Sequence, residues 1–182
     1  MITLNECIDR MAINSNSQQN PFESLSMLVV DDNFYMLKII GTILRGFGID
    51  KIVEVKSAEE AFATLRQMHV DIIIVDYVME MLDGIEFTNL VRNSKDSPNP
   101  MIPIIMLTAY SERKRVIEAR DSGVTEFCCK PVTARELFLK IRSVIARPRQ
   151  FVRTKKYFGP DRRRMQDVDF DGEEKRLDEM FD

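Results

Sequence analysis

The chain has 182 residues, of which 45% are hydrophobic and 30% are charged, and its formal net charge is -3. This balance is typical of one globular domain with a small addition, and it gives no general attraction for nucleic acid or an anionic membrane. No apolar run approaches the roughly 20 residues that cross a bilayer, and the start lacks the pattern of a signal peptide. Three cysteines, two of them adjacent, indicate a reducing compartment, so we expect a cytoplasmic protein.

From residue 26 onward, short apolar runs alternate with segments that carry apolar residues at helical spacing. Two of the helical segments start with capping-box pairs, Ser57 with Glu60 and Thr133 with Glu136. This alternation predicts an α/β fold with a parallel sheet and helices on both of its faces. The predicted strands are 26–33, 51–56, 70–76, 101–108 and 126–129, and the predicted helices are 34–46, 57–68, 85–92, 111–122 and 133–146.

Polar residues stand at the ends of several of these strands. The first strand ends in Asp31 and Asp32, the third in Asp76, the fourth in Thr108, and Lys130 follows the last. In parallel sheets of this kind, binding sites lie beyond the carboxyl ends of the strands. We therefore expect three carboxylates, one hydroxyl and one ammonium group to meet at one edge of the sheet.

This set of groups is suited to phosphoryl transfer with a divalent cation. Neighbouring carboxylates repel one another, and Mg²⁺, which takes oxygen ligands, removes that conflict. Asp76 is then the candidate nucleophile, and Mg²⁺ and Lys130 would neutralise charge on the phosphoryl oxygens. Taken singly, Asp31 and Asp32 could cap a helix, Thr108 could be a strand-end hydroxyl and Lys130 a solvated lysine. Their joint occurrence at matching strand ends favours the site.

Residues 26–146 resemble the receiver domain of two-component response regulators. The resemblance lies in the motifs LVVDDN, IIIVDYVMEMLDG, IIMLTAY and FCCKPV. It implies a flavodoxin-like, doubly wound fold whose five-stranded parallel sheet has the order 2-1-3-4-5. It also implies that Asp76 receives a phosphoryl group from a histidine kinase or a phosphotransfer protein. Catalysis would then be limited to the protein's own phosphorylation and dephosphorylation, and we expect no metabolic enzyme.

The resemblance also implies the ligands of the metal ion. Asp32, Asp76 and the backbone carbonyl of Val78 would bind Mg²⁺ directly, whereas Asp31 would bind it mainly through water. Glu80 stands where the family usually has proline. Since Val78 contributes only its carbonyl, Mg²⁺ binding should tolerate this departure.

A conformational switch follows from the same resemblance. Thr108 and Lys130 would contact the phosphoryl group, and Thr108 would move toward it while Phe127 turns inward. The face of the family's fourth helix, fifth strand and fifth helix would then change its affinity for an output partner, or for a second copy in a homodimer. Val78 and Tyr110 occupy the two positions that modulate hydrolysis in this family, and their apolar and aromatic side chains predict a long-lived phosphoryl-aspartate.

The adjacent Cys128 and Cys129 in the last predicted strand have two interpretations. A redox role beside Lys130 would need an exposed thiolate in electropositive surroundings. Cysteine also behaves as a small hydrophobic residue in buried strands, and this interpretation is favoured.

We expect three parts in the chain: an N-terminal extension or linker at 1–24, the receiver at 25–146 and a charged, partly disordered tail at 147–182. Within the tail, residues 147–164 hold eight Arg and Lys and one acid, interleaved with aromatic residues, whereas residues 165–182 hold eight acids and two bases. The basic part could bind nucleic acid, or its aromatic residues could pack on the receiver. Screening by the acidic part argues against nucleic acid.

Residues 167–178 imitate an EF-hand calcium loop, with acids at positions one, three and five and glycine at six. Position twelve is Asp178 instead of a bidentate glutamate, and position eight is Glu174 where an apolar residue is needed. An acidic disordered tail is therefore favoured over calcium binding.

For the whole chain, the leading hypothesis is a phosphorylatable receiver. Its rivals are a nucleic-acid-binding regulator that uses residues 147–164 and a scaffold that needs no phosphorylation.

Overall fold

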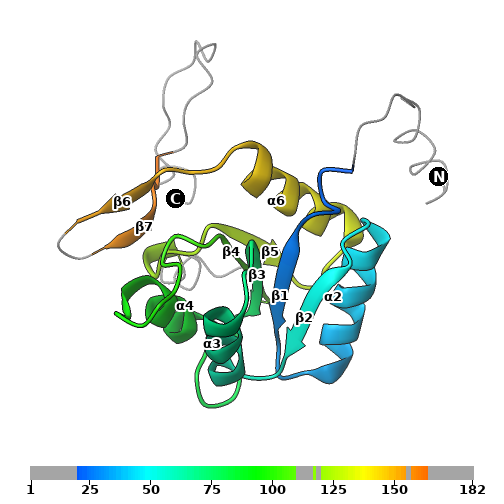
Figure 1. Cartoon of the computed structure of the whole chain (residues 1–182), viewed down its shortest axis with the longest axis horizontal. Helices are drawn as coiled ribbons and strands as arrows, with labels where there is room; N and C mark the ends of the chain where they lie inside the picture. The colour runs from blue at the N-terminus through cyan, green and yellow to red at the C-terminus, as the bar shows by residue number, and fades with distance from the viewer. Residues whose placement is uncertain (1–19, 110–116, 118–119, 155–156, 164–182) are drawn as a thin grey trace, which may run out of the picture.

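The structure is a computed structural model that describes residues 20–109, 117, 120–154 and 157–163. A parallel sheet of five strands, in the order β2-β1-β3-β4-β5, forms its centre (Figure 1), and this confirms the predicted flavodoxin-like, doubly wound α/β fold. The strands are β1 (Ser26–Val30), β2 (Lys51–Val55), β3 (Ile72–Asp76), β4 (Ile104–Thr108) and β5 (Glu126–Cys129). The helices are α2 (Phe34–Gly46), α3 (Ala58–Gln67), α4 (Gly84–Asn93) and α6 (Ala134–Ala146).

Alternate residues of the central strands feed two separate hydrophobic cores. In β1, Leu28 and Val30 pack with residues of α3 and α4, whereas Met27 and Val29 pack with residues of α2 and α6. The strands β1, β3 and β4 are buried along their whole length. Burial on both faces explains why these strands appear in the sequence as continuous apolar runs rather than as alternating ones.

The helices begin at side chains that cap their first turns. Ser57 and Thr133 accept the backbone N–H groups of Glu60 and Glu136, as the capping-box spacing predicts. The cap of α4 is Asp83, which forms a complete capping box with Glu86. These caps fix where each loop at the carboxyl edge of the sheet turns into a helix.

Three predicted elements differ from the structure or lie partly outside it. The strand predicted at 26–33 ends at Val30, so Asp31 and Asp32 lie just beyond the strand and not within it. The strand predicted at 101–108 begins only at Ile104, directly after Pro103, which has no N–H group to give to a sheet. Of the helix predicted at 111–122, the described residues Ile117, Arg120 and Asp121 are helical. The EF-hand-like segment 167–178 and most of the N-terminal extension lie outside the described residues.

A small antiparallel hairpin follows α6 and has no counterpart among the predicted elements. It consists of β6 (Phe151–Arg153) and β7 (Phe158–Pro160), and β7 contacts α4 (Figure 1). The hairpin therefore belongs to the charged tail in sequence, but its aromatic residues lie against the receiver.

Among the helices described by the structure, none has the length and apolar character needed to cross a membrane.

Gly84, the first residue of α4, lies directly against the backbone at the end of β3. A Cβ atom there would collide with the backbone carbonyl oxygen of Asp76, whereas a Cβ atom at Gly46 would meet nothing within 4 Å. We expect Gly84→Ala to lower the free energy of unfolding by roughly 1–3 kcal/mol, since the backbone of β3 cannot give way easily. Gly46→Ala should leave it unchanged or raise it by at most about 1 kcal/mol. Urea unfolding of both variants tests this, and equal effects would contradict the close packing.

Candidate functional site at the carboxyl edge of the sheet

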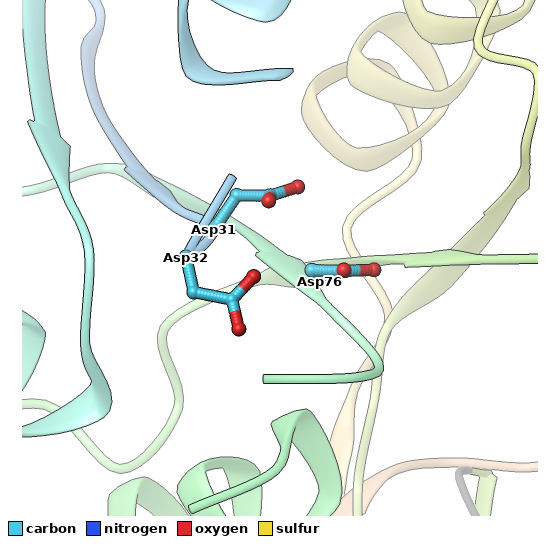
Figure 2. A group of neighbouring side chains, drawn as sticks. All are labelled: Asp31, Asp32 and Asp76. Atoms are coloured by element: carbon cyan, nitrogen blue, oxygen red, sulfur yellow. The ribbon is translucent and has the colours of Figure 1, made fainter. Parts of the chain in front are cut away.

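Three carboxylates gather where β1 and β3 end. Asp31 and Asp32 directly follow β1, and Asp76 is the last residue of the adjacent strand β3 (Figure 2). One oxygen atom from each of the three carboxylates lies within 4.8 Å of the others. The structure therefore brings together the three acids that the sequence placed at matching strand ends.

Asp31 is held inside the site and does not cap the following helix. Its side chain is 0% exposed, and its Oδ1 atom accepts the backbone N–H of Asn33 at 2.9 Å. The cap of α2 is Asn33, whose Oδ1 atom accepts the N–H groups of Tyr35 and Met36. Because Asn33 takes the capping role, both aspartates remain available to the site, which excludes the simpler explanation of a helix cap.

Lys130 reaches the carboxylates from the segment that follows β5. Its Nζ atom lies 2.9 Å from Oδ2 of Asp76 and 3.5 Å from Oδ2 of Asp31. One ammonium group thus bridges two buried or nearly buried carboxylates, while Asp32 stands exposed beside them. Among the described residues, three negative charges here face a single lysine, so the cluster keeps an excess of negative charge.

Burial raises the pKa of the Asp31 carboxyl, and the negative charge of Asp76 raises it further. The hydrogen bond from Asn33 and the charge of Lys130 act in the opposite direction but are outweighed. Keeping Asp31 ionised in this position therefore lowers the free energy of unfolding. A hard cation among these oxygens would remove that cost, and the donor set, carboxylate oxygens only, fits Mg²⁺.

The loop after β3 is tied to the cluster by a hydrogen bond that the sequence does not reveal. The backbone N–H of Glu80 donates to Oδ2 of Asp32 at 3.0 Å. Proline, usual at this position in the resembled family, has no N–H to make this bond. The donor of this hydrogen bond is a main-chain N–H, which almost every residue carries. The only hint of the bond in the sequence is that Glu80 stands where the family usually has proline.

The remaining predicted site residues occupy different surroundings. Thr108 is buried at the end of β4, and its carbonyl accepts the backbone N–H of Lys130 at 2.8 Å. Phe127 is half-buried and packs against the core that α3 and α4 cover. Val78 is 52% exposed on the loop that follows Asp76, and Tyr110 lies outside the described residues.

The two cysteines of β5 differ in their exposure. Cys128 is fully buried in the core with α2 and α6, and burial raises the pKa of its thiol to about 12. It is therefore a protonated, apolar core residue at neutral pH, as the favoured interpretation holds. Cys129 is exposed, so the interpretation as a buried residue is wrong for it, and both thiols are free of disulfides.

Comparison with known proteins agrees with this fold. The family model for the response regulator receiver domain matches residues 27–142. The chemotaxis protein CheY of Pseudomonas aeruginosa is 32% identical over 123 residues, which cover 68% of this chain and 98% of that protein. The heme response regulator HssR of Staphylococcus aureus MRSA252 is 36% identical over 120 residues, but the match spans only 51% of its length. The chain belongs to the response regulator receiver family, whose members are signalling proteins of two-component systems rather than metabolic enzymes.

Solved structures show the same architecture. A putative response regulator from Chloroflexus aurantiacus superposes with a TM-score of 0.62 at 27% identity, covering 68% of this chain and 98% of that one. The receiver domain of the Saccharomyces cerevisiae response regulator Ssk1, crystallised with the histidine phosphotransfer protein Ypd1, has a TM-score of 0.60 at 27% identity and covers 67% of this chain and 89% of that one. The receiver domain of the sensor histidine kinase PA1611, whose structure holds magnesium in the active site cleft, is alike in fold at 24% identity.

The excess negative charge makes a prediction about stability. In the absence of divalent cations, we expect Asp31→Asn to raise the free energy of unfolding by at least about 1 kcal/mol, because it removes like-charge repulsion across a few ångströms while an amide oxygen can still accept the N–H of Asn33. Urea unfolding in EDTA measures this. Asp83→Asn is the control, since asparagine caps helices as well as aspartate does. A loss of stability in Asp31→Asn would contradict the charge excess.

Proposed function

We propose that Asp76 accepts a phosphoryl group from a phosphohistidine donor, and that Asp31, Asp32, Asp76 and the carbonyl of Val78 hold the Mg²⁺ ion that assists the transfer. The observation that carries the proposal is the meeting of three carboxylates and Lys130 at the carboxyl edge of the sheet. When bound, Mg²⁺ supplies positive charge against the phosphoryl oxygens. An oxygen of Asp76 forms the new bond to phosphorus, and the histidine nitrogen leaves with the electron pair of the broken N–P bond.

The residues around Asp76 support this chemistry by position and charge. Lys130 lies 2.9 Å from the Asp76 carboxylate, which would carry the phosphoryl group. The ammonium group of Lys130 can therefore pair with the phosphoryl oxygens after transfer. Thr108 ends the neighbouring strand β4, one residue after Leu107, which pairs with Asp76, and this position supports a role for Thr108. Its hydroxyl is proposed to donate to a phosphoryl oxygen, and Phe127 to follow the movement of Thr108.

Apolar side chains beside the site favour a protein as the phosphoryl donor. Phe34 and Tyr35, in the first turn of α2 and close in sequence to Asp31 and Asp32, are 49% and 76% exposed. Exposed aromatic residues are typical of protein interfaces. We propose that a histidine kinase or phosphotransfer protein docks there, in line with the crystallised complex of Ypd1 with the receiver domain of Ssk1.

The output face is proposed to include β5, α6 and the segment 111–122, and to bind an output partner or a second copy of the chain.

Binding of nucleic acid by the basic tail is disfavoured. Two of its arginines are engaged within the chain. Arg153 stacks on Phe158, and Arg162 stacks on Tyr157 and pairs with Asp121. Releasing these contacts would oppose any gain from phosphate binding. The division into extension, receiver and tail and a cytoplasmic location stay predictions.

The proposal is tested by incubating the full chain with Mg²⁺ and acetyl phosphate and measuring the mass of the intact protein. We expect one added phosphoryl group that requires Mg²⁺ and that is lost in Asp76→Asn, because the amide oxygen is a far weaker nucleophile than the carboxylate. Asp83→Asn, a carboxylate-to-amide change outside the cluster, should be labelled like the unchanged chain. The absence of an adduct, where another receiver is labelled, would favour the phosphorylation-independent scaffold.

The lifetime of the phosphoryl-aspartate depends on access of water, which Val78 and Tyr110 are proposed to hinder. We expect the adduct to persist for far longer than seconds after acetyl phosphate is removed. Val78→Asn should shorten its lifetime about tenfold, equivalent to a barrier lowered by about 1.4 kcal/mol, because an amide can hold the attacking water. Val78→Ile should leave the lifetime unchanged. Decay within seconds in the unchanged chain would contradict this proposal.

A further inference from the structure

The hairpin of β6 and β7 is seated on the receiver rather than extending from it. It follows the residues that the family model matches, 27–142. A Cβ atom at Gly159 of β7 would lie 2.8 Å from the Cα atom of Gly123, so two glycines allow the backbones to touch. Gly123 lies in the turn before β5, where its φ angle of +98° favours glycine. The hairpin thus covers the end of the sheet where β5 begins.

A buried arginine of α4 connects the hairpin to the receiver. Arg92 is 1% exposed, donates through Nε to the carbonyl of Gly123 at 3.0 Å and through Nη1 to the carbonyl of Pro100 at 2.8 Å. The ring of Phe151 in β6 covers this guanidinium at 5.0 Å. Burial lowers the pKa of Arg92 to about 9, so the group remains a cation at neutral pH. The hairpin supplies the aromatic face that shields this cation from water.

Two arginines of the tail also connect the hairpin to the receiver. Arg149 donates through Nη1 to the carbonyl of Thr125 at 3.3 Å and through Nη2 to the carbonyl of Asp161. Arg162 pairs with Asp121 at 3.2 Å. Together with Arg92, they attach the hairpin to the segment Asp121–Thr125.

The attached segment lies at the base of the two strands that carry switch residues. The backbone N–H of Ile104, the first residue of β4, donates to Oγ1 of Thr125 at 3.0 Å, and the N–H of Thr125 donates to the carbonyl of Ile104 at 2.9 Å. At the opposite end, β4 finishes at Thr108 and β5 leads to Lys130. The hairpin therefore restrains one end of strands whose other ends, about 13 Å away, form the site.

We propose that this hairpin is a strap that holds the receiver in its unphosphorylated arrangement and is loosened by phosphorylation of Asp76. The inference rests on the proposed function. All the strap contacts occur while Lys130 pairs directly with the Asp76 carboxylate. A phosphoryl group on Asp76 enters between these two groups, and in the strap mechanism the end of β5 shifts together with Lys130 while the strap holds its start. Because coupling is reciprocal, weakening the strap must favour phosphorylation by the same factor as phosphorylation weakens the strap.

The test uses the full chain and the variant Gly159→Val. Its side chain would meet the ring of Tyr157 within the hairpin and the backbone of Gly123 in the receiver, and so undock the hairpin. Gly46→Ala is the control, since its Cβ meets nothing. Hydrogen exchange of residues 151–160 reports docking, and intact mass at a subsaturating level of acetyl phosphate with Mg²⁺ reports phosphorylation. We expect faster exchange in Gly159→Val, and a ratio of phosphorylated to unphosphorylated chain that is about fivefold or more higher. The same residues should also exchange faster in the phosphorylated unchanged chain. Arg149→Met, which removes the bond to Thr125, should shift both readouts in the same direction.

The outcomes separate the strap from the proposed function. A chain that takes up no phosphoryl group would contradict the proposed function and with it the strap. Normal phosphorylation of the unchanged chain, with no shift in variants whose hairpin exchanges faster, would overturn the strap alone. Unchanged exchange of the hairpin in both Gly159→Val and Arg149→Met would overturn the account of its docking.

Discussion

The repulsion among three carboxylates at one edge of a parallel sheet is the constraint on which the site depends. Asp31 and Asp76 are buried beside each other, and the single ammonium group of Lys130 pairs with both. Asp32 brings a third negative charge within 4.8 Å of them, and this additional repulsion lowers the stability of the fold. Within the described part of the chain, three carboxylates against one ammonium group leave two negative charges in excess, which a divalent cation balances. We propose that the bound cation in turn favours the arrival of an anionic phosphoryl group.

The fold meets this constraint with main-chain groups that leave the carboxylates free for chemistry. Asn33 caps α2, so neither neighbouring aspartate is needed there. Gly84 allows α4 to begin against the carbonyl of Asp76, and the N–H of Glu80 ties the intervening loop to Asp32. The strands β1, β3 and β4 are buried along their whole length, and this close packing is what would let a small change at Asp76 reach the far end of β4.

The sheet, its helices and the gathering of the acids could be predicted because each depends on a local pattern. Continuous apolar runs mark strands buried on both faces, and the topology of parallel sheets brings their carboxyl ends together. The hairpin could not be predicted in this way. Its strands have three residues each, and its docking depends on Arg92, a helical residue whose burial no sequence pattern shows. The bond from Glu80 to Asp32 likewise involves a main-chain group, which every residue except proline carries.

Stability as a function of Mg²⁺ concentration tests the central claim, that the carboxylate cluster is a cation site, most directly. Binding to the folded chain alone should raise the free energy of unfolding by about 1.4 kcal/mol for each tenfold rise in free Mg²⁺ once the site is mostly occupied. We expect this slope in the unchanged chain and in Asp83→Asn, and its loss in Asp32→Asn, since Asp32 is the exposed member of the cluster and is proposed to bind the metal ion directly. An unchanged free energy of unfolding across the Mg²⁺ series, or an equal slope in Asp32→Asn, would contradict the account.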